Sequence, residues 1–148
     1  MWDKIQETVK YIKDKTHFTP EYGVILGSGL GSFTDDINIE HTLPYTEIPN
    51  FPVSTVEGHQ GALVFGKIGT KNVVAMQGRF HFYEGYDMKE VTFPVRVLKY
   101  LGVDKLIVSN ASGGVNPNYK VGSIVILKDQ INMMPEHPLR GKNDERLG

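Results

Sequence analysis

The residues with the clearest chemical potential lie in the segment 76–86, directly after a short apolar run. Arg79, His81 and Tyr83 alternate along this segment, so in an extended backbone their side chains project from one face while the intervening phenylalanines project from the other. A guanidinium, an imidazole and a phenol on one face can bind a small anion beside a hydroxylated ring. The alternative interpretation is an exposed strand end with packed aromatic rings and solvated charges.

Three short apolar runs, at residues 24–26, 73–76 and 106–108, each lead directly into a polar loop. Uncharged runs of this kind that are rich in β-branched residues are typical of buried strands. In open α/β sheets, ligands bind at the carboxyl ends of the strands. If the three strands are parallel neighbours, their loops converge, and the sequence then predicts one site formed by all three.

The first of these loops, Gly27-Ser28-Gly29-Leu30-Gly31, is suited to an anion. Glycines leave several backbone N–H groups accessible, and Ser28 adds a hydroxyl donor. A dinucleotide-binding turn fits less well, because the third glycine comes one residue early, at Gly31, and no strand ending in an acid follows about 20 residues later. A phosphate loop is favoured over both this turn and a tight turn without a ligand.

A second histidine, His59, is flanked by glycines at positions 58 and 61 and is either a donor to a ligand or part of a surface turn. The other three histidines have no partner at ligand spacing. The chain has no cysteine and no H-x-x-x-H pattern, so we expect no metal site. Ser28 does not lie in the G-x-S-x-G pattern of a nucleophile elbow.

Composition predicts one soluble domain covering residues 1–148. Hydrophobic residues make up 40% and charged residues 22% of the chain, as in ordinary globular proteins. The net charge of −1 gives no reason to expect nucleic acid or an anionic membrane as a partner. The absence of cysteine is compatible with a reducing cytoplasm, and neither a signal peptide nor a membrane span is expected.

Apolar periodicity predicts an α/β fold with a mixed, largely parallel central sheet flanked by helices. Asp87 and Glu90 have the spacing of a capping box, and residues 69–71 are typical of a hairpin turn. The prolines in residues 33–58 indicate a loop with at most a short edge strand. The expected elements are helices at 2–15 and 87–101 and strands at 24–26, 62–65, 72–76, 106–108 and 124–127.

The loops, in this order, resemble those of the trimeric purine nucleoside phosphorylases. The most specific match is Gly-Arg-Phe-His-Phe-Tyr-Glu-Gly-Tyr at residues 78–86. The other matching stretches are residues 27–31, 51–56, 58–61, 93–97, 110–117, 129–132 and 138–141. The resemblance implies a nucleoside phosphorylase-like α/β/α sandwich that is incomplete at the C-terminus, because family members continue well beyond the point matching Gly148.

The resemblance also implies two groups of site residues. Those expected to bind orthophosphate are Ser28, Arg79, His81 and the backbone at Ala111. Those expected to contact the ribose or the nucleoside are His59, Tyr83 and Asn110. Arg79 and His81 would be the catalytic residues. From their proximity in sequence, we expect Glu84 to pair with Arg79 and hold its guanidinium in place.

The implied reaction is the reversible phosphorolysis of purine ribonucleosides to the free base and ribose 1-phosphate, a step of purine salvage. Orthophosphate would be a co-substrate, and neither a metal nor an organic cofactor would be needed. The intact family is trimeric, so a homo-oligomer or a missing C-terminal half is the expected partner. The alternatives are a nucleoside hydrolase, a methylthioadenosine phosphorylase relative, and an anion-binding fragment without turnover.

Overall fold

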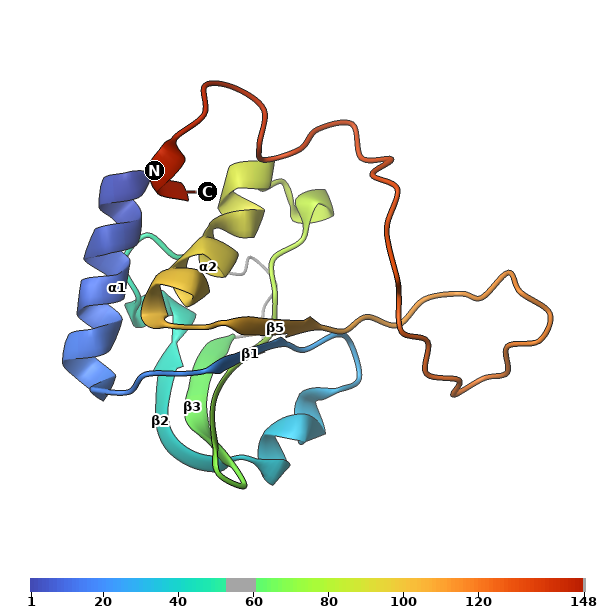
Figure 1. Ribbon diagram of the computed structural model, residues 1–148, viewed down its shortest axis with the longest axis horizontal. Helices are drawn as coiled ribbons and strands as arrows, with labels where there is room; N and C mark the ends of the chain where they lie inside the picture. The colour runs from blue at the N-terminus through green and yellow to red at the C-terminus, as the bar shows by residue number, and fades with distance from the viewer. Residues whose placement is uncertain (53–60, 148) are drawn as a thin grey trace.

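A mixed five-stranded sheet with two α-helices packed on one face forms the body of the protein (Figure 1). The computed structural model describes residues 1–52 and 61–147. The sheet order is β2-β3-β4-β1-β5. The α-helices and strands are α1 (Trp2–Thr16), β1 (Tyr22–Ile25), β2 (Asn38–Pro44), β3 (Ala62–Ile68), β4 (Lys71–Gln77), α2 (Met88–Leu101) and β5 (Lys105–Val108). Short 3-10 helices are η1 (Gly31–Asp36), η2 (Tyr45–Glu47), η3 (Phe82–Glu84) and η4 (Glu145–Leu147).

Strand β1 lies between β4 and β5 and is parallel to both. In the aligned register, Ile25 is opposite Met76 on one side and Val108 on the other. The β2–β3 and β3–β4 pairs are antiparallel, so the sheet is mixed, as the sequence predicts. The carboxyl ends of β1, β4 and β5 therefore lie level at one edge of the sheet, and the three predicted loops leave from that edge.

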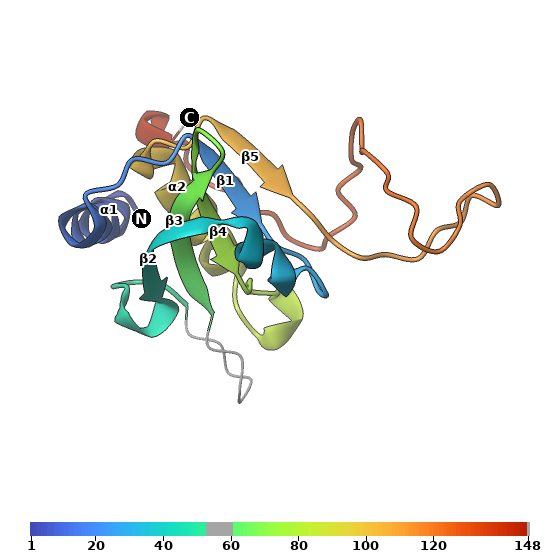
Figure 2. The same ribbon diagram turned by 90° about the horizontal axis from the view of Figure 1, so that it is seen from below.

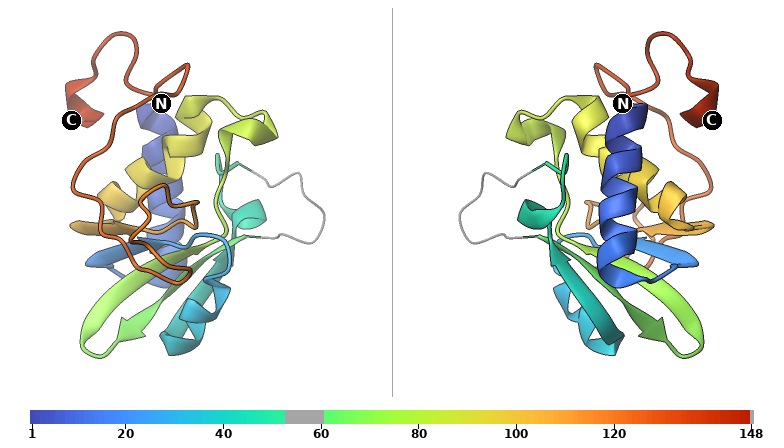
Figure 3. Two further views of the ribbon diagram at one scale, coloured as in Figure 1. Left: turned by 90° about the vertical axis from the view of Figure 1, so that its right-hand side faces the viewer. Right: turned by 90° about the vertical axis from the view of Figure 1, so that its left-hand side faces the viewer.

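Alternating side chains in the strands form two hydrophobic clusters, one on each face of the sheet. Leu63 and Phe65 of β3 face the helices, whereas Val64 belongs to the cluster on the opposite face. Figures 2 and 3 show both α-helices on one side of the sheet and η1 on the other. The residues that α1 buries include Ile5, Val9 and Ile12, which have the spacing of one apolar helix face.

Helix α2 begins and ends where the sequence predicts. The Asp87 carboxylate accepts the Glu90 N–H at 2.7 Å, and the Glu90 carboxylate accepts the Asp87 N–H at 2.8 Å, which completes a capping box. The helix ends at Gly102, whose φ of 120° is readily available only to glycine. Within the described residues, no helix is both long and apolar enough to cross a membrane.

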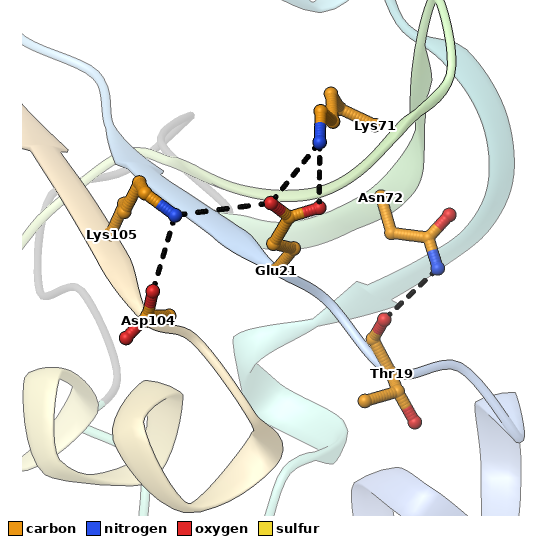
Figure 4. A network of polar contacts seen from close by, with 6 residues as sticks. All are labelled: Thr19, Glu21, Lys71, Asn72, Asp104 and Lys105. Atoms are coloured by element: carbon orange, nitrogen blue, oxygen red, sulfur yellow. Dashed lines mark hydrogen bonds and ion pairs between the residues drawn. The ribbon is translucent and has the colours of Figure 1, made fainter.

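At the amino ends of β1, β4 and β5, a polar network lies opposite the edge that carries the loops (Figure 4). The Glu21 carboxylate forms ion pairs with Lys71 Nζ at 3.3 Å and with Lys105 Nζ at 3.9 Å. The Asn72 side chain donates to the Thr19 carbonyl at 3.0 Å. These groups are partly or fully exposed, so each ion pair contributes little energy. Together they connect the starts of three strands.

Strand β2 is longer than the sequence suggested. It runs for seven residues at the edge of the sheet, with a bulge between Ile39 and His41. Pro44 is its last residue, where a missing N–H costs no central ladder bond. Pro44 therefore ends the strand and the later prolines follow it, so the proline content of residues 33–58 did not reveal how long the strand is.

The prediction of a strand at residues 124–127 is wrong. In the described structure these residues pair with no other strand, and Ile124 and Ile126 are more than nine-tenths exposed. The chain beyond β5 loops away from the sheet (Figure 1, orange) before its last residues return to the helices. There the Arg146 guanidinium lies 5.1 Å from the centre of the Trp2 ring. An apolar run becomes a strand only when a neighbouring strand satisfies its backbone.

Candidate functional site

A cavity of about 440 Å³ opens at the carboxyl ends of β1 and β4. Its lining includes four of the predicted site residues: Ser28, Arg79, His81 and Tyr83. The volume lies within the range of small-molecule sites. The loops after β1 and β4 therefore form one hollow at the place where an open α/β sheet binds its ligands.

The loop after β1 packs directly on the turn after β5. A Cβ at Gly27 would lie 2.6 Å from the Ser109 carbonyl oxygen and 2.8 Å from Asn110 Cα. Only glycine permits this approach, because real Cβ atoms do not come so close to backbone. The exposed Ser28 follows immediately and lies at the cavity wall. The loops after β1 and β5 are therefore in contact, as the predicted convergence requires.

Arg79 joins the loops after β4 and β5. Its Nη1 donates to the Ser109 carbonyl at 2.9 Å, and its Nε donates to His81 Nε2 at 3.1 Å. Across residues 1–52 and 61–147, Nη2 makes no hydrogen bond. A guanidinium held at two of its nitrogens retains donors and a full positive charge for an anion.

Glu84 pairs with His81, and the expected pairing with Arg79 is wrong. Glu84 Oε1 lies 2.5 Å from His81 Nδ1 and also accepts the His81 backbone N–H at 3.0 Å. The 3-10 turn η3 causes this, because it brings the carboxylate back over the residue three positions earlier. A carboxylate accepts and a guanidinium donates, which assigns the proton to Nδ1 and the lone pair to Nε2.

The aromatic residues of this segment divide between core and surface. Phe80 is buried and lies 5.1 Å from the Tyr45 ring, measured between centroids. Tyr83 is 82% exposed and stacks on the His81 ring, with centroids 4.7 Å apart. The backbone is not extended as far as Tyr83, because η3 begins at Phe82. Arg79, His81 and Tyr83 all line the cavity, but Phe80 lines it too, so the alternation of an extended strand does not account for this arrangement.

Tyr45 lines the cavity and supports its wall, a role that sequence reasoning did not predict. Its hydroxyl donates to the Gly78 carbonyl at 2.7 Å, at a turn where φ is +91°. Burial raises the pKa of the Tyr45 phenol, so this group remains a neutral donor. Its ring also fills the space where a side chain at Gly61 would lie.

The remaining predicted residues are less well placed. Asn110 and Ala111 are exposed, in the turn beside Gly27, and are not in the cavity lining. His59 lies outside the described residues. Ser109 is the contact that sequence reasoning missed, although its position directly after a strand parallel to β1 is the signal that could have identified it.

Known proteins resemble the chain over almost all of its length. A family model described as the phosphorylase superfamily matches residues 21–147. Purine nucleoside phosphorylase 1 of Geobacillus stearothermophilus is 54% identical over 144 residues, which cover 97% of this chain and 53% of the relative. Purine nucleoside phosphorylase of Rattus norvegicus is 49% identical over 150 residues, covering 99% of this chain and 52% of the relative.

Solved structures show the same fold. The crystal structure of Schistosoma mansoni purine nucleoside phosphorylase complexed with a monocyclic inhibitor has a TM-score of 0.75 and 47% identity, over 80% of this chain and 43% of that chain. A purine nucleoside phosphorylase in complex with ribose-1-phosphate has a TM-score of 0.76 and 49% identity, over 80% and 43%. This chain spans about half the length of the curated relatives. Since the family model covers most of its residues, the chain belongs to the phosphorylase superfamily.

Proposed function

We propose that this chain forms the phosphate-binding part of a purine nucleoside phosphorylase, which catalyses the reversible phosphorolysis of purine ribonucleosides to free base and ribose 1-phosphate. The observation that carries the proposal is the cavity itself, where Ser28 of one loop meets Arg79 and His81 of another. The similarity to purine nucleoside phosphorylases, one of them in complex with ribose-1-phosphate, supports the same substrate class.

In this proposal, orthophosphate lies between the Gly27 loop and the Arg79 side chain. Ser28 offers a hydroxyl donor, and the guanidinium offers the N–H groups that its two protein contacts leave over. Because the guanidinium is held before the anion arrives, it needs little reorganisation when the anion binds. Glu84 orients the His81 ring, which forms the adjoining wall.

In the proposed chemical step, the bound phosphate lies next to the ribose of the nucleoside. Phosphate attacks the anomeric carbon as the glycosidic bond breaks, and the ribose passes through an oxocarbenium-like transition state of the kind met in glycoside hydrolysis. A fixed anion stabilises the developing positive charge. Tyr83, Asn110 and His59 would contact the ribose or the nucleoside, and the backbone at Ala111 would complete the phosphate site.

The setting of the reaction belongs to the same proposal. We expect residues 1–148 to act as one domain within a homotrimeric cytoplasmic enzyme of purine salvage, with orthophosphate as co-substrate and with no metal or organic cofactor. The second candidate is anion binding without turnover. It rests on the same cavity, whose lining includes the anion donors Ser28 and Arg79.

The test is phosphate-dependent loss of inosine, measured with the chain alone and with the region that its relatives have in addition. Phosphorolysis predicts loss only when phosphate is present, with ribose 1-phosphate as product. Loss without phosphate would indicate a hydrolase and contradict the proposal. No loss in either setting, together with phosphate binding by calorimetry, would favour the second candidate.

Arg79→Ala separates phosphate recognition from nucleoside recognition. Removal of a charged donor should weaken phosphate binding by about tenfold or more, and nucleoside binding far less. Lys67→Ala is the control, because Lys67 pairs with Glu40 on the β2–β3 ribbon, away from the cavity lining. Equal losses of both ligands in Arg79→Ala would contradict the assignment.

A further inference from the structure

Ser109, the first residue after β5, makes hydrogen bonds to both other loops of the site. Its hydroxyl accepts the Gly27 N–H at 3.0 Å and donates to the Ile25 carbonyl at 3.2 Å. Its own backbone N–H also donates to the Ile25 carbonyl, at 3.1 Å. Its carbonyl accepts Arg79 Nη1 at 2.9 Å. Ser109 therefore binds the end of β1, the first glycine of its loop and the guanidinium after β4.

These contacts fix two donors that the proposed phosphate site requires. The bond to Gly27 sets where the chain leaves β1, and hence where Ser28 lies at the cavity wall. The bond to Arg79 holds one nitrogen of the guanidinium while His81 holds another. A planar group held at two corners has a fixed orientation, so the directions of its remaining N–H donors are fixed as well.

The hydroxyl has no simple substitute at this position. Ser109 is partly buried, and the space between its carbonyl and Gly27 is too small for a Cβ on the glycine. Without the hydroxyl, the Gly27 N–H would lose its acceptor in a tightly packed place. An unsatisfied donor there favours a shift of the loop, which would move Ser28 away from its position.

We propose that Ser109 is a positioning residue for orthophosphate, acting through the Gly27 loop and through Arg79 without touching the anion. The inference rests on the proposed function, since it requires phosphate in this cavity. A purely structural role is the alternative, in which the hydroxyl only secures the ends of β1 and β5. A positioning role predicts that loss of the hydroxyl lowers phosphate affinity, whereas a purely structural role predicts unchanged affinity.

The experiment compares Ser109→Thr with Ser109→Val in the full chain, because these side chains share a shape and differ in the hydroxyl. Isothermal titration with inorganic phosphate measures affinity, and thermal unfolding followed by circular dichroism measures stability. Val should weaken phosphate binding by about tenfold, whereas Thr should stay within about twofold of the original protein. Ser109→Ala should behave like Val and serves if Val does not fold.

Ser112→Ala is the matched control, because Ser112 is an exposed serine three residues along the same loop. It should bind phosphate like the original chain. If Ser109→Val and Ser109→Ala unfold at a lower temperature but bind phosphate normally, the inference is overturned and the proposed function stays intact. An original chain that does not bind phosphate at all would overturn both.

Discussion

At the scale of single residues, the geometry of the site depends on hydrogen bonds among its own residues. Arg79 lies between Ser109 and His81, and His81 lies between Arg79 and Glu84. Each partner can only donate or only accept, except the imidazole, so the chain of contacts defines a single tautomer. The sequence showed that these residue types were present, but the turn at η3 decided that Glu84 pairs with His81.

Glu84→Gln tests this tautomer. The amide can place either its oxygen or its nitrogen towards Nδ1, so the preference for a proton there should weaken. Nitrogen NMR of the imidazole should show the Nδ1-protonated form of His81 in the original chain and a mixture in the variant. Glu90→Gln, in the cap of α2, is the control and should leave His81 unchanged. An Nε2-protonated ring in the original chain would contradict the contact network.

Tyr45→Phe tests the support of the cavity wall and its dependence on pH. Loss of the bond to the Gly78 carbonyl should cost about 1 kcal/mol near neutral pH. Burial raises the pKa of Tyr45 above its ordinary value of 10.0, so above that pH the unfolded chain loses a proton that the folded chain retains. Stability should therefore fall as pH rises above 10.0, and less steeply in the variant. The free energy of unfolding is measured by denaturant titration at several pH values. An equal slope of this free energy against pH in the two proteins would contradict a buried, neutral phenol.

At the scale of elements, β1, β3 and β4 could be predicted because most of their residues are buried on both faces of the sheet. The runs that became β1 and β4 are uniformly apolar, and their parallel pairing brought the predicted loops together. Residues 124–127 have a similar composition but no strand beside them in the described structure. An apolar composition shows that a segment can form a buried strand. Whether it does so depends on the elements that pack beside it.

Gly27→Ala tests whether the β1 and β5 loops must touch. The new methyl would meet the Ser109 backbone, so the loops should separate, with a lower melting temperature and weaker phosphate binding. Gly31→Ala is the control for stability, because a Cβ there meets nothing within 4 Å. Unchanged melting of Gly27→Ala would show that the loops are not in contact.

At the scale of the whole molecule, the β5 edge of the sheet carries exposed apolar side chains in the described structure. Strand β5 pairs with β1 alone among the described strands, and Ile107 and Val108 are more than half exposed. The loop beyond β5 adds further exposed apolar residues. An unpaired edge with apolar side chains is a surface on which another chain can add a strand.

We therefore expect the chain to self-associate as its concentration rises. Ile107→Lys should reduce the association, because a charge on an edge strand opposes pairing. Sedimentation velocity over a range of concentrations measures both proteins, and Lys13→Ala, on the exposed face of α1, is the control. A monomer at every concentration would contradict this reading of the β5 edge.

The most direct test of the account is a crystal structure of the chain with orthophosphate. We expect one phosphate in the cavity, contacted by Ser28 of the loop after β1 and by Arg79 of the loop after β4, with Ser109 still hydrogen-bonded to Gly27 and to Arg79. A phosphate bound elsewhere, or a structure in which the three loops lie apart, would contradict it.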